Sequence, residues 1–442
     1  MIKKLNIKKL FGQFNYEIEF KNTGITIITG PNGFGKSTIL KIIEALADKD
    51  LYEICQFPFE ELSVSLNNDE IVIKKTKSSV VVDECQLELY SKKLIENYRR
   101  RHELPFIERI GPETYVDMRF DKVLSIDEYK KILKESSEDE EPIKDKLIAV
   151  NYETARKNRK ETNKFKELDK RFYTFKRNIG EIKFIKEQRL LRQETVEEGP
   201  YYSREKRSTV IEAINEIPSK LKKEIQETIV KHSQISSQLD STFPSRLFDS
   251  IESIGQELFL DTFAEIILRQ EKLQSYNLIK DLRVIAPKKF NSEYSKALKV
   301  YLDDTITKLS VFDDLLSKLD LFVEIVNNKL NFKRISVSSE YGVKIVQNDN
   351  KELELNKLSS GEQQIIVLYY DLIFGIQNKV VLLIDEPEIS LHVAWQRELM
   401  NDFNKIIDLK NYNLSIIIAT HSPQVINNNW HSIIDLGEQN GK

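Results

Sequence analysis

The stretch ITIITGPNGFGKSTILKIIEAL, residues 25–46, decides the fold of this chain. It opens with a β-branched run, Ile25 to Thr29, which predicts a buried strand. Behind the glycines, apolar residues recur at helical spacing (Ile39, Leu40, Ile43 and Leu46). A strand, a glycine-rich loop and a helix in this order are typical of a phosphate-binding loop, where backbone N–H groups turn inward around an anion. The sequence therefore predicts an α/β fold built around a nucleotide site.

The loop itself, GPNGFGKST, offers different groups to a bound phosphate. Glycine is scarce, 14 of 442 residues, yet three glycines fall within six positions here, which disfavours a plain glycine-rich turn. We expect Lys36 to neutralise the β- and γ-phosphates and Ser37 to ligate Mg²⁺ through its hydroxyl. The remaining predicted nucleotide-binding residues are Gly30, Asn32, Gly33, Gly35 and Thr38.

A second site motif lies near the other end, in NKVVLLIDEPEISLH, residues 378–392. Its apolar run predicts a central parallel strand that ends at Asp385 and Glu386, at the edge where open α/β sheets bind ligands. We expect Asp385 to hold Mg²⁺ together with Ser37, and Glu386 to act as general base on the attacking water. A solvated turn would also explain two carboxylates after a strand, but the phosphate loop favours the site.

A third strand is predicted in LSIIIATHSPQVI, residues 414–426, and it places His421 at the same edge. A histidine there would sense the γ-phosphate and orient the water. The alternative, a purely structural histidine, stays open for His421. For His392, in the segment SLH, packing and support of the site are equally compatible with the sequence.

The segment LSSGEQQ, residues 358–364, precedes another apolar stretch of helical spacing. Two serines and a glycine at a helix N-terminus offer a hydroxyl, backbone N–H groups and a favourable dipole to an anion. The alternative is a helix that is simply capped by serine. A chain with one phosphate loop has no obvious use for a second anion site on its own surface.

Together with GPNGFGKST, LLIDEP and ATHSP, the segment LSSGE resembles the signature motif of ATP-binding-cassette (ABC) ATPases. The resemblance implies an ABC-type α/β head with a mixed sheet, ATP and Mg²⁺ as cofactors, and ATP hydrolysis. It also implies at least a homodimer, whose two heads stack head to tail with each nucleotide between one phosphate loop and the partner's signature. The residues implied to act in trans are Ser359, Ser360, Gly361 and Glu362.

The distance between the motifs predicts a large insertion, since 323 positions separate Lys36 from Ser359. We expect residues 1–90 to form the N-terminal part of the head, with antiparallel strands beside the phosphate-loop unit. Residues 91–330 are expected to form a mainly helical, compact lobe, with a helix from residue 211 that breaks at Pro244. Residues 331–442 are expected to complete the head.

Within the insertion, EIKFIKEQRLLRQ (181–193) predicts a strand near 181–187 that returns to the core. Gln188 at its end matches the glutamine with which ABC ATPases touch Mg²⁺, and a charged strand exit is the alternative. Residues 199–208, GPYYSREKRS, are typical of a loop. The basic stretch 155–178 is compatible with a solvated amphipathic helix or with binding of phosphate backbones.

Composition limits the remaining choices. Lysine and arginine (67) nearly balance aspartate and glutamate (70), so no global basic field draws the chain to nucleic acid. Two cysteines exclude a disulfide framework and a four-thiolate zinc site. The start, MIKKLNIKKLFG, lacks the apolar core of a signal peptide, and no apolar run is long enough to span a membrane. These features predict a cytoplasmic protein without membrane contact.

The layout is similar to the AAA15-type, RecF/OLD-like branch of the ABC ATPases, and within it to the ATPase subunits of two-component anti-phage systems such as PARIS, Septu and retron-associated ATPases. That resemblance implies a sensor or scaffold that controls a separate effector nuclease of the Toprim or HNH type. Five histidines and two cysteines give this chain no HNH or zinc-nuclease constellation, so we expect the nuclease to be another polypeptide. Two alternatives stay open: a RecF- or SMC-like ATPase acting directly on DNA, and a nucleotide-gated scaffold with negligible turnover.

Overall fold

The fold is described from a computed structural model of the 442-residue chain. The described residues are 2–21, 24–48, 54, 56–67, 69–75, 79–82, 85–88, 107–109, 114–117, 122–125, 173–187, 189–198, 205–249, 252–279, 290–376, 380–410, 414–427 and 432–439. Gln188 and most of the basic stretch 155–178 lie outside them.

A five-stranded parallel sheet carries all the strands that the site motifs predict. Its order is β11 (Glu181–Ile185), β17 (Val380–Asp385), β18 (Leu414–Ala419), β3 (Gly24–Thr29) and β19 (Ile433–Asp435). All residues of β17 and β18 are buried, as expected for strands covered on both faces. The strands predicted at 25–29, 380–384 and 416–418, and the returning strand near 181–187, are thereby confirmed.

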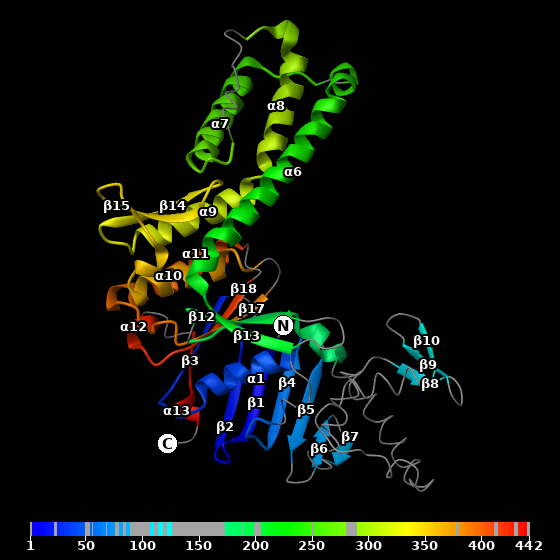
Figure 1. The fold of residues 1–442 in the computed structure, drawn as a ribbon, viewed down its shortest axis with the longest axis vertical. Coiled ribbons are helices and arrows are strands. Elements are labelled where there is room, and N and C mark those ends of the chain that lie inside the picture. The colour runs from blue at the N-terminus through cyan, green and yellow to red at the C-terminus, as the bar shows by residue number, and fades with distance from the viewer. Residues whose placement is uncertain are drawn as a thin grey trace.

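One face of this sheet packs on α1 (Lys36–Asp48), which lies between it and a second, antiparallel sheet. The second sheet has the order β2 (Phe14–Glu19), β1 (Ile2–Leu10), β4 (Glu61–Leu66), β5 (Glu70–Lys75), β6 (Ser79–Val82) and β7 (Cys85–Glu88). Buried and exposed positions mostly alternate along β2, as the antiparallel prediction requires. Figure 1 shows these strands beside α1 at the lower end of the molecule.

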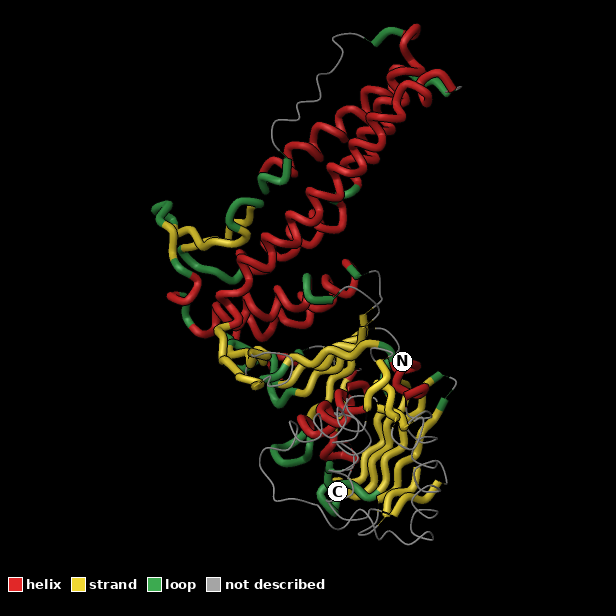
Figure 2. The backbone as a smooth tube through the Cα atoms, turned by 45° about the vertical axis from the view of Figure 1, so that its right-hand side comes forward, coloured by secondary structure: helices red, strands yellow, loops and turns green. Residues whose placement is uncertain are grey.

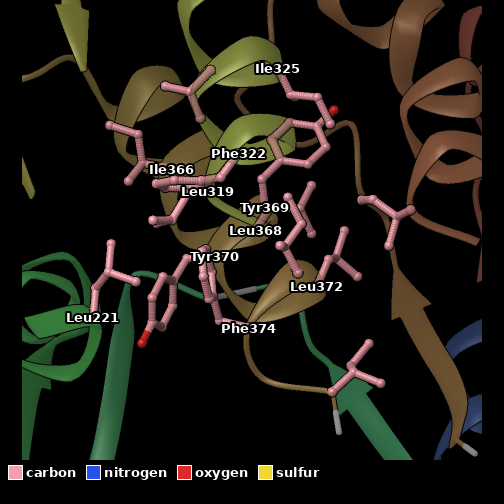
Figure 3. Close-up of a cluster of buried hydrophobic side chains, with 14 of the residues drawn as sticks. Leu221, Leu319, Phe322, Ile325, Ile366, Leu368, Tyr369, Tyr370, Leu372 and Phe374 are labelled. Carbon is pink, nitrogen blue, oxygen red and sulfur yellow. The ribbon is translucent and has the colours of Figure 1, made fainter. Parts of the chain in front are cut away.

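The opposite face of the parallel sheet packs on α10 (Ser360–Ile373) and α11 (Val393–Leu409), with α9 (Asp313–Asn327) beyond them. Because side chains alternate along a strand, Leu382 joins this core while its neighbour Leu383 joins the core around α1. Figure 3 shows Phe322 of α9 among aromatic residues of the α10 segment, and its ring lies edge-on to Phe374, with ring centroids 5.6 Å apart. The two cores make the head a layered α/β structure, which confirms the predicted fold class.

The helical insertion forms a long arm, whereas the sequence predicted a compact lobe. Its spine is α6 (Ala213–Asp249), a 37-residue helix of about 55 Å. Figures 1 and 2 show it rising away from the sheets beside α7 (Gln256–Ser275) and α8 (Ser295–Ser310). Apolar residues of α6 are buried only in its first half, before the helix leaves the head.

The prediction of a break at Pro244 was wrong, since α6 continues through this residue. A proline inside a helix lacks the N–H group and crowds the preceding turn. Here the Arg246 guanidinium donates to the carbonyl of Leu239 at 2.6 Å and pairs with Asp304 of α8. These contacts tie the distal end of α6 to its neighbour α8.

Smaller elements complete the chain. The strands expected after residue 332 are present as β14 (Lys333–Ser338), β15 (Gly342–Gln347) and β16 (Glu352–Leu353). The loop expected at 199–208 is wrong for residues 205–208, because β12 (Leu191–Glu198) pairs with β13 (Glu205–Glu212). The other described elements are β8 (Ile107–Arg109), β9 (Thr114–Asp117), β10 (Lys122–Ser125), η1 (Ser292–Tyr294), η2 (Leu355–Lys357), α12 (Pro423–Ile426), α13 (Leu436–Gln439) and a helix over 173–179.

Among the described residues, no helix combines the length and the apolar character that crossing a membrane would need.

Candidate active site

The phosphate loop connects β3 to α1 in the predicted context, and its glycines have the backbone that the sequence led us to expect. Gly30, Gly33 and Gly35 all have positive φ, at 146°, 85° and 88°. A Cβ atom at Gly35 would lie only 2.7 Å from the Leu10 side chain, so this position also lacks room for a side chain. Loop shape and close packing therefore both require glycine here.

Lys36 is 6% exposed, and its ammonium lies within the loop. Its Nζ donates hydrogen bonds to the carbonyls of Gly30 at 2.9 Å and Pro31 at 3.4 Å. Asn32, by contrast, is exposed at the turn, and Thr38 is half-buried in the first turn of α1. The cation is thus held beside the N-terminus of α1, where an anion is favoured.

The strand ends come together at one edge of the parallel sheet. Asp385 pairs with Ala419, and Ala419 with Ile28, so β17, β18 and β3 end in register. The N–H of Glu386 donates to the Ala419 carbonyl at 2.9 Å, and the N–H of Thr420 to that of Ile28 at 3.1 Å. Residues that follow these strands therefore share one site, as the carboxyl edge of a parallel sheet predicts.

Ser37 and Asp385 are in direct contact. The Ser37 hydroxyl donates a 2.9 Å hydrogen bond to Oδ1 of Asp385, which is 5% exposed. Burial raises the pKa of the Asp385 carboxyl, and the Ser37 hydrogen bond works in the opposite direction. A hydroxyl and a carboxylate oxygen side by side suit the oxygen-only coordination of Mg²⁺. The donors present fit the ion, and the third predicted ligand, Gln188, lies outside the described residues.

Glu386 and His421 form the second contact of the site. His421 Nδ1 lies 2.5 Å from Glu386 Oε2, and the His421 side chain is 57% exposed. Burial raises the pKa of Glu386 to about 7, aided by the neighbouring Glu388 carboxylate and opposed by His421. Such a carboxyl accepts a proton readily near neutral pH.

His392 begins α11 as its N-cap, with Nδ1 accepting from the N–H of Ala394 at 3.3 Å. His392 is exposed, so its structural role here is that of a helix cap rather than of a packed side chain.

The segment 358–362 begins α10 at the surface. The Ser359 side chain accepts from the N–H of Glu362, and the Glu362 carboxylate accepts from the N–H of Ser359, which makes a complete capping box. Lys333 of β14 adds an ion pair to Glu362 at 3.0 Å. Ser359 and Ser360 are exposed, whereas Gly361 is buried and a Cβ there would lie 2.6 Å from the Ser390 carbonyl.

Within the described part of the chain, no hydrogen bond or ion pair joins residues 359–362 to the phosphate loop. The serine-capped helix that the sequence left open as an alternative is therefore present. Ser359 and Ser360 are exposed at this terminus, and the Ser359 hydroxyl donates to the Glu362 carboxylate at 2.9 Å.

Two buried charged residues of the site escaped the sequence analysis. Glu388, 5% exposed, accepts hydrogen bonds from the Thr420 hydroxyl and from the N–H of Ser422 at 3.2 Å. Arg189, also 5% exposed, donates to the carbonyls of Glu386 and Pro387. Sequence alone offers little signal for either, because charged residues surround both in the chain.

Comparison with known proteins agrees with this arrangement. Residues 1–426 match the AAA ATPase domain family (AAA_15), and the chain belongs to this family.

Solved structures similar to the chain include Smc head domains. The Smc head of Pyrococcus furiosus, with an extended coiled coil and bound to the C-terminal domain of ScpA, is 14% identical with a TM-score of 0.33, and the match covers 98% of this chain and 92% of that one. An Smc head bound to the C-terminal winged-helix domain of ScpA is 12% identical (TM-score 0.35, 98% and 93% covered). The SMC head of Thermotoga maritima is 12% identical (TM-score 0.29, 96% and 90% covered).

Proposed function

We propose that this chain binds ATP with Mg²⁺ at the edge of the parallel sheet and hydrolyses it to ADP and phosphate. The observation that carries the proposal is the meeting of Ser37 with Asp385 and of Glu386 with His421, beside the phosphate loop. Membership of an ATPase family supports the same activity. The geometry favours hydrolysis over binding alone because it supplies a base as well as an anion site.

Each group has a separate task in the proposed reaction. The loop N–H groups and Lys36 bind the β- and γ-phosphates, and Ser37 and Asp385 hold Mg²⁺, which neutralises phosphate charge when bound. Glu386 accepts a proton from the attacking water, whose oxygen bonds to the γ-phosphorus. The bond from that phosphorus to the β–γ bridging oxygen breaks, and its electron pair leaves with ADP. His421, in contact with Glu386, orients this carboxylate and the water.

We further propose an ABC-type homodimer in which Ser359, Ser360 and Gly361 of one copy contact the nucleotide of the other. The exposure of both serines at the start of α10 supports this arrangement, since these groups are accessible to a second copy. Glu362 would hold the helix terminus in shape through its capping box and its ion pair with Lys333. In this scheme residues 1–90 and 331–442 form the head, and residues 91–330 form the insertion.

The proposed biological role is a sensor or scaffold that uses ATP-driven head engagement to control a separate effector nuclease in anti-phage defence. The motif resemblance supports this role, and the long arm of α6, α7 and α8 offers surface for a partner. A Toprim or HNH protein encoded next to this chain would be the expected effector. Phage challenge of cells carrying both proteins should lower plating efficiency, and Lys36→Ala should remove that protection.

The ATPase proposal is tested by turnover of the wild-type chain and of Glu386→Gln. Turnover should fall at least about 100-fold in the variant, because the base is lost, while ATP-bound oligomers persist. Glu398→Gln, which changes a half-exposed glutamate of α11, is the matched control and should keep full turnover. Wild-type protein without measurable turnover would favour the nucleotide-gated scaffold. Tight, salt-dependent binding to duplex DNA would instead favour the RecF- or SMC-like alternative.

A further inference from the structure

Arg189 contacts the loop that follows β17 and carries the proposed base Glu386, although it belongs to a distant part of the chain. It follows β11 and is 5% exposed, and its Nη2 donates to the carbonyls of Glu386 at 3.3 Å and Pro387 at 3.1 Å. The next residue, Leu190, accepts from the N–H of Ala213, the first residue of α6, at 2.8 Å. Arg189 therefore lies where the arm joins the sheet, and it touches the backbone of the loop that carries the proposed base.

The backbone of Glu386 needs such support. Its φ is +45°, in the left-handed region that side chains other than glycine rarely adopt. A backbone of this kind persists only where surrounding contacts hold it. The N–H of Glu386 is held by the Ala419 carbonyl at 2.9 Å, and its carbonyl accepts from Arg189 at 3.3 Å and from the N–H of Ile389 at 3.2 Å. Both peptide groups that flank this residue are thus anchored, and these anchors direct its side chain toward His421.

The Arg189 guanidinium is costly to bury, which argues against a role in stability alone. Burial lowers its pKa to about 10, with the Glu388 carboxylate acting in the opposite direction. Among the described residues, Nε and Nη1 of Arg189 and Oε2 of Glu388 have no hydrogen-bond partner. A whole buried ion pair can be replaced by apolar residues without loss of stability, whereas removing one partner leaves the other charge buried and unpaired. The two loop carbonyls are the contacts that an apolar side chain could not make.

We propose that Arg189 is a positioning residue, which holds the Glu386–Pro387 backbone so that the Glu386 carboxylate stays aligned for proton transfer. This inference rests on the proposed ATPase function and deepens it. It gives the segment after β11 a role in the reaction in addition to the Mg²⁺ contact that the sequence predicts for Gln188.

The test compares Arg189→Lys and Arg189→Met with the wild type in ATP turnover and in hydrogen exchange of the loop. We expect kcat to fall about tenfold or more in Arg189→Met, with KM for ATP and nucleotide affinity within about twofold. Arg189→Lys, which keeps one donor and the charge, should recover part of kcat. Amide exchange over residues 384–392 should be faster in Arg189→Met, whereas exchange of α11 should not change.

Lys318→Met is the matched control, because Lys318 is also buried and charged but pairs with Glu224 and Asp314 at the base of the arm. It should leave both kcat and loop exchange unchanged. A folded Arg189→Met variant with wild-type kcat and unchanged loop exchange would overturn the proposal. So would an equal loss of kcat in Lys318→Met, since that result would indicate general destabilisation.

A double variant separates positioning from simple neutralisation of Glu388. Arg189→Met with Glu388→Gln removes both buried charges and keeps an acceptor for Thr420 and Ser422. We expect the thermal stability lost in Arg189→Met to recover while kcat stays low; recovery of kcat as well would overturn the proposal. If the wild type shows no turnover, the proposed function fails, and loop exchange still decides whether Arg189 holds the loop.

Discussion

The hydroxyl of Ser37 and the carboxylate of Asp385, 348 positions apart in the chain, meet through a 2.9 Å hydrogen bond. Ser37 lies in the first turn of α1, after the phosphate loop, and Asp385 ends the buried strand β17. The contact brings the two oxygen donors proposed for Mg²⁺ into one place. It also links the two ends of the chain across the long insertion.

The first prediction concerns this pair. Ser37→Ala should raise the Mg²⁺ concentration needed for half-maximal ATP turnover by about tenfold or more, because one oxygen ligand is lost. Ser37→Thr keeps the hydroxyl and should restore the wild-type requirement. Turnover measured against Mg²⁺ concentration, with excess EDTA as the zero point, gives the comparison. Equal Mg²⁺ curves for all three proteins would contradict the assignment of Ser37.

Lys36 gives the second prediction. Lys36→Ala should weaken binding of a fluorescent ATP analogue by about 10- to 100-fold, because charge-assisted hydrogen bonds to the phosphates disappear. Lys74→Ala, which removes an exposed lysine of β5, is the control and should bind normally. If both variants bind the analogue as tightly as the wild type, residues 30–38 do not hold the phosphates.

The third prediction tests whether two copies share a nucleotide. Ser360 lies in the exposed first turn of α10, so Ser360→Glu adds a charge that the helix dipole tolerates but that repels phosphate. This variant and Lys36→Ala should each lose most turnover. Mixed together, they should regain part of it, because each mixed dimer contains one intact site formed by Lys36 of one copy and Ser360 of the other.

The neutral change Ser360→Gln is the control for size, and it should retain more turnover than Ser360→Glu. Mixtures that stay as inactive as the separate variants would argue against sites shared between copies.

The fourth prediction is a pH dependence of stability that is centred on Lys410. Its Nζ donates to the Ile376 carbonyl at 2.7 Å, and burial lowers its pKa from 10.5 to about 8, with Lys318 and Lys183 acting in the same direction. Between pH 8 and 10.5 the folded chain releases this proton while the unfolded chain keeps it. The Lys410 contribution to stability therefore rises with pH in this window.

Thermal or urea unfolding of the wild type and Lys410→Met between pH 7 and 10 gives the measurement. Above pH 8, the unfolding free energy of the wild type should increase relative to that of Lys410→Met by up to about 1 kcal/mol per pH unit. Parallel profiles for the two proteins would show that Lys410 keeps its ordinary pKa.

Much of the head could be predicted because its signals are local. The loop backbone has positive φ at positions 30, 33 and 35, and this conformation favours glycine. The run 380–384 is apolar because its strand is buried on both faces of the sheet. The arm was harder to predict. Beyond Ile225 no residue of α6 is buried, and the helix continues through Pro244, where a proline in the sequence favours a break.

The amino-acid sequence alone determined where the phosphate loop, the buried strands and the strand-end carboxylates lie, because glycine placement and apolar runs act on their own neighbourhood. Only the tertiary structure decided that Arg189 supports the backbone of Glu386 and that Glu388 connects to Thr420 and Ser422. Arg189, Glu386 and Glu388 are charged residues from two separate segments, and a charge in a sequence predicts exposure rather than burial. Arg189 and Glu388 become buried where the ends of β17, β18 and β3 meet, and only the folded sheet brings those ends together.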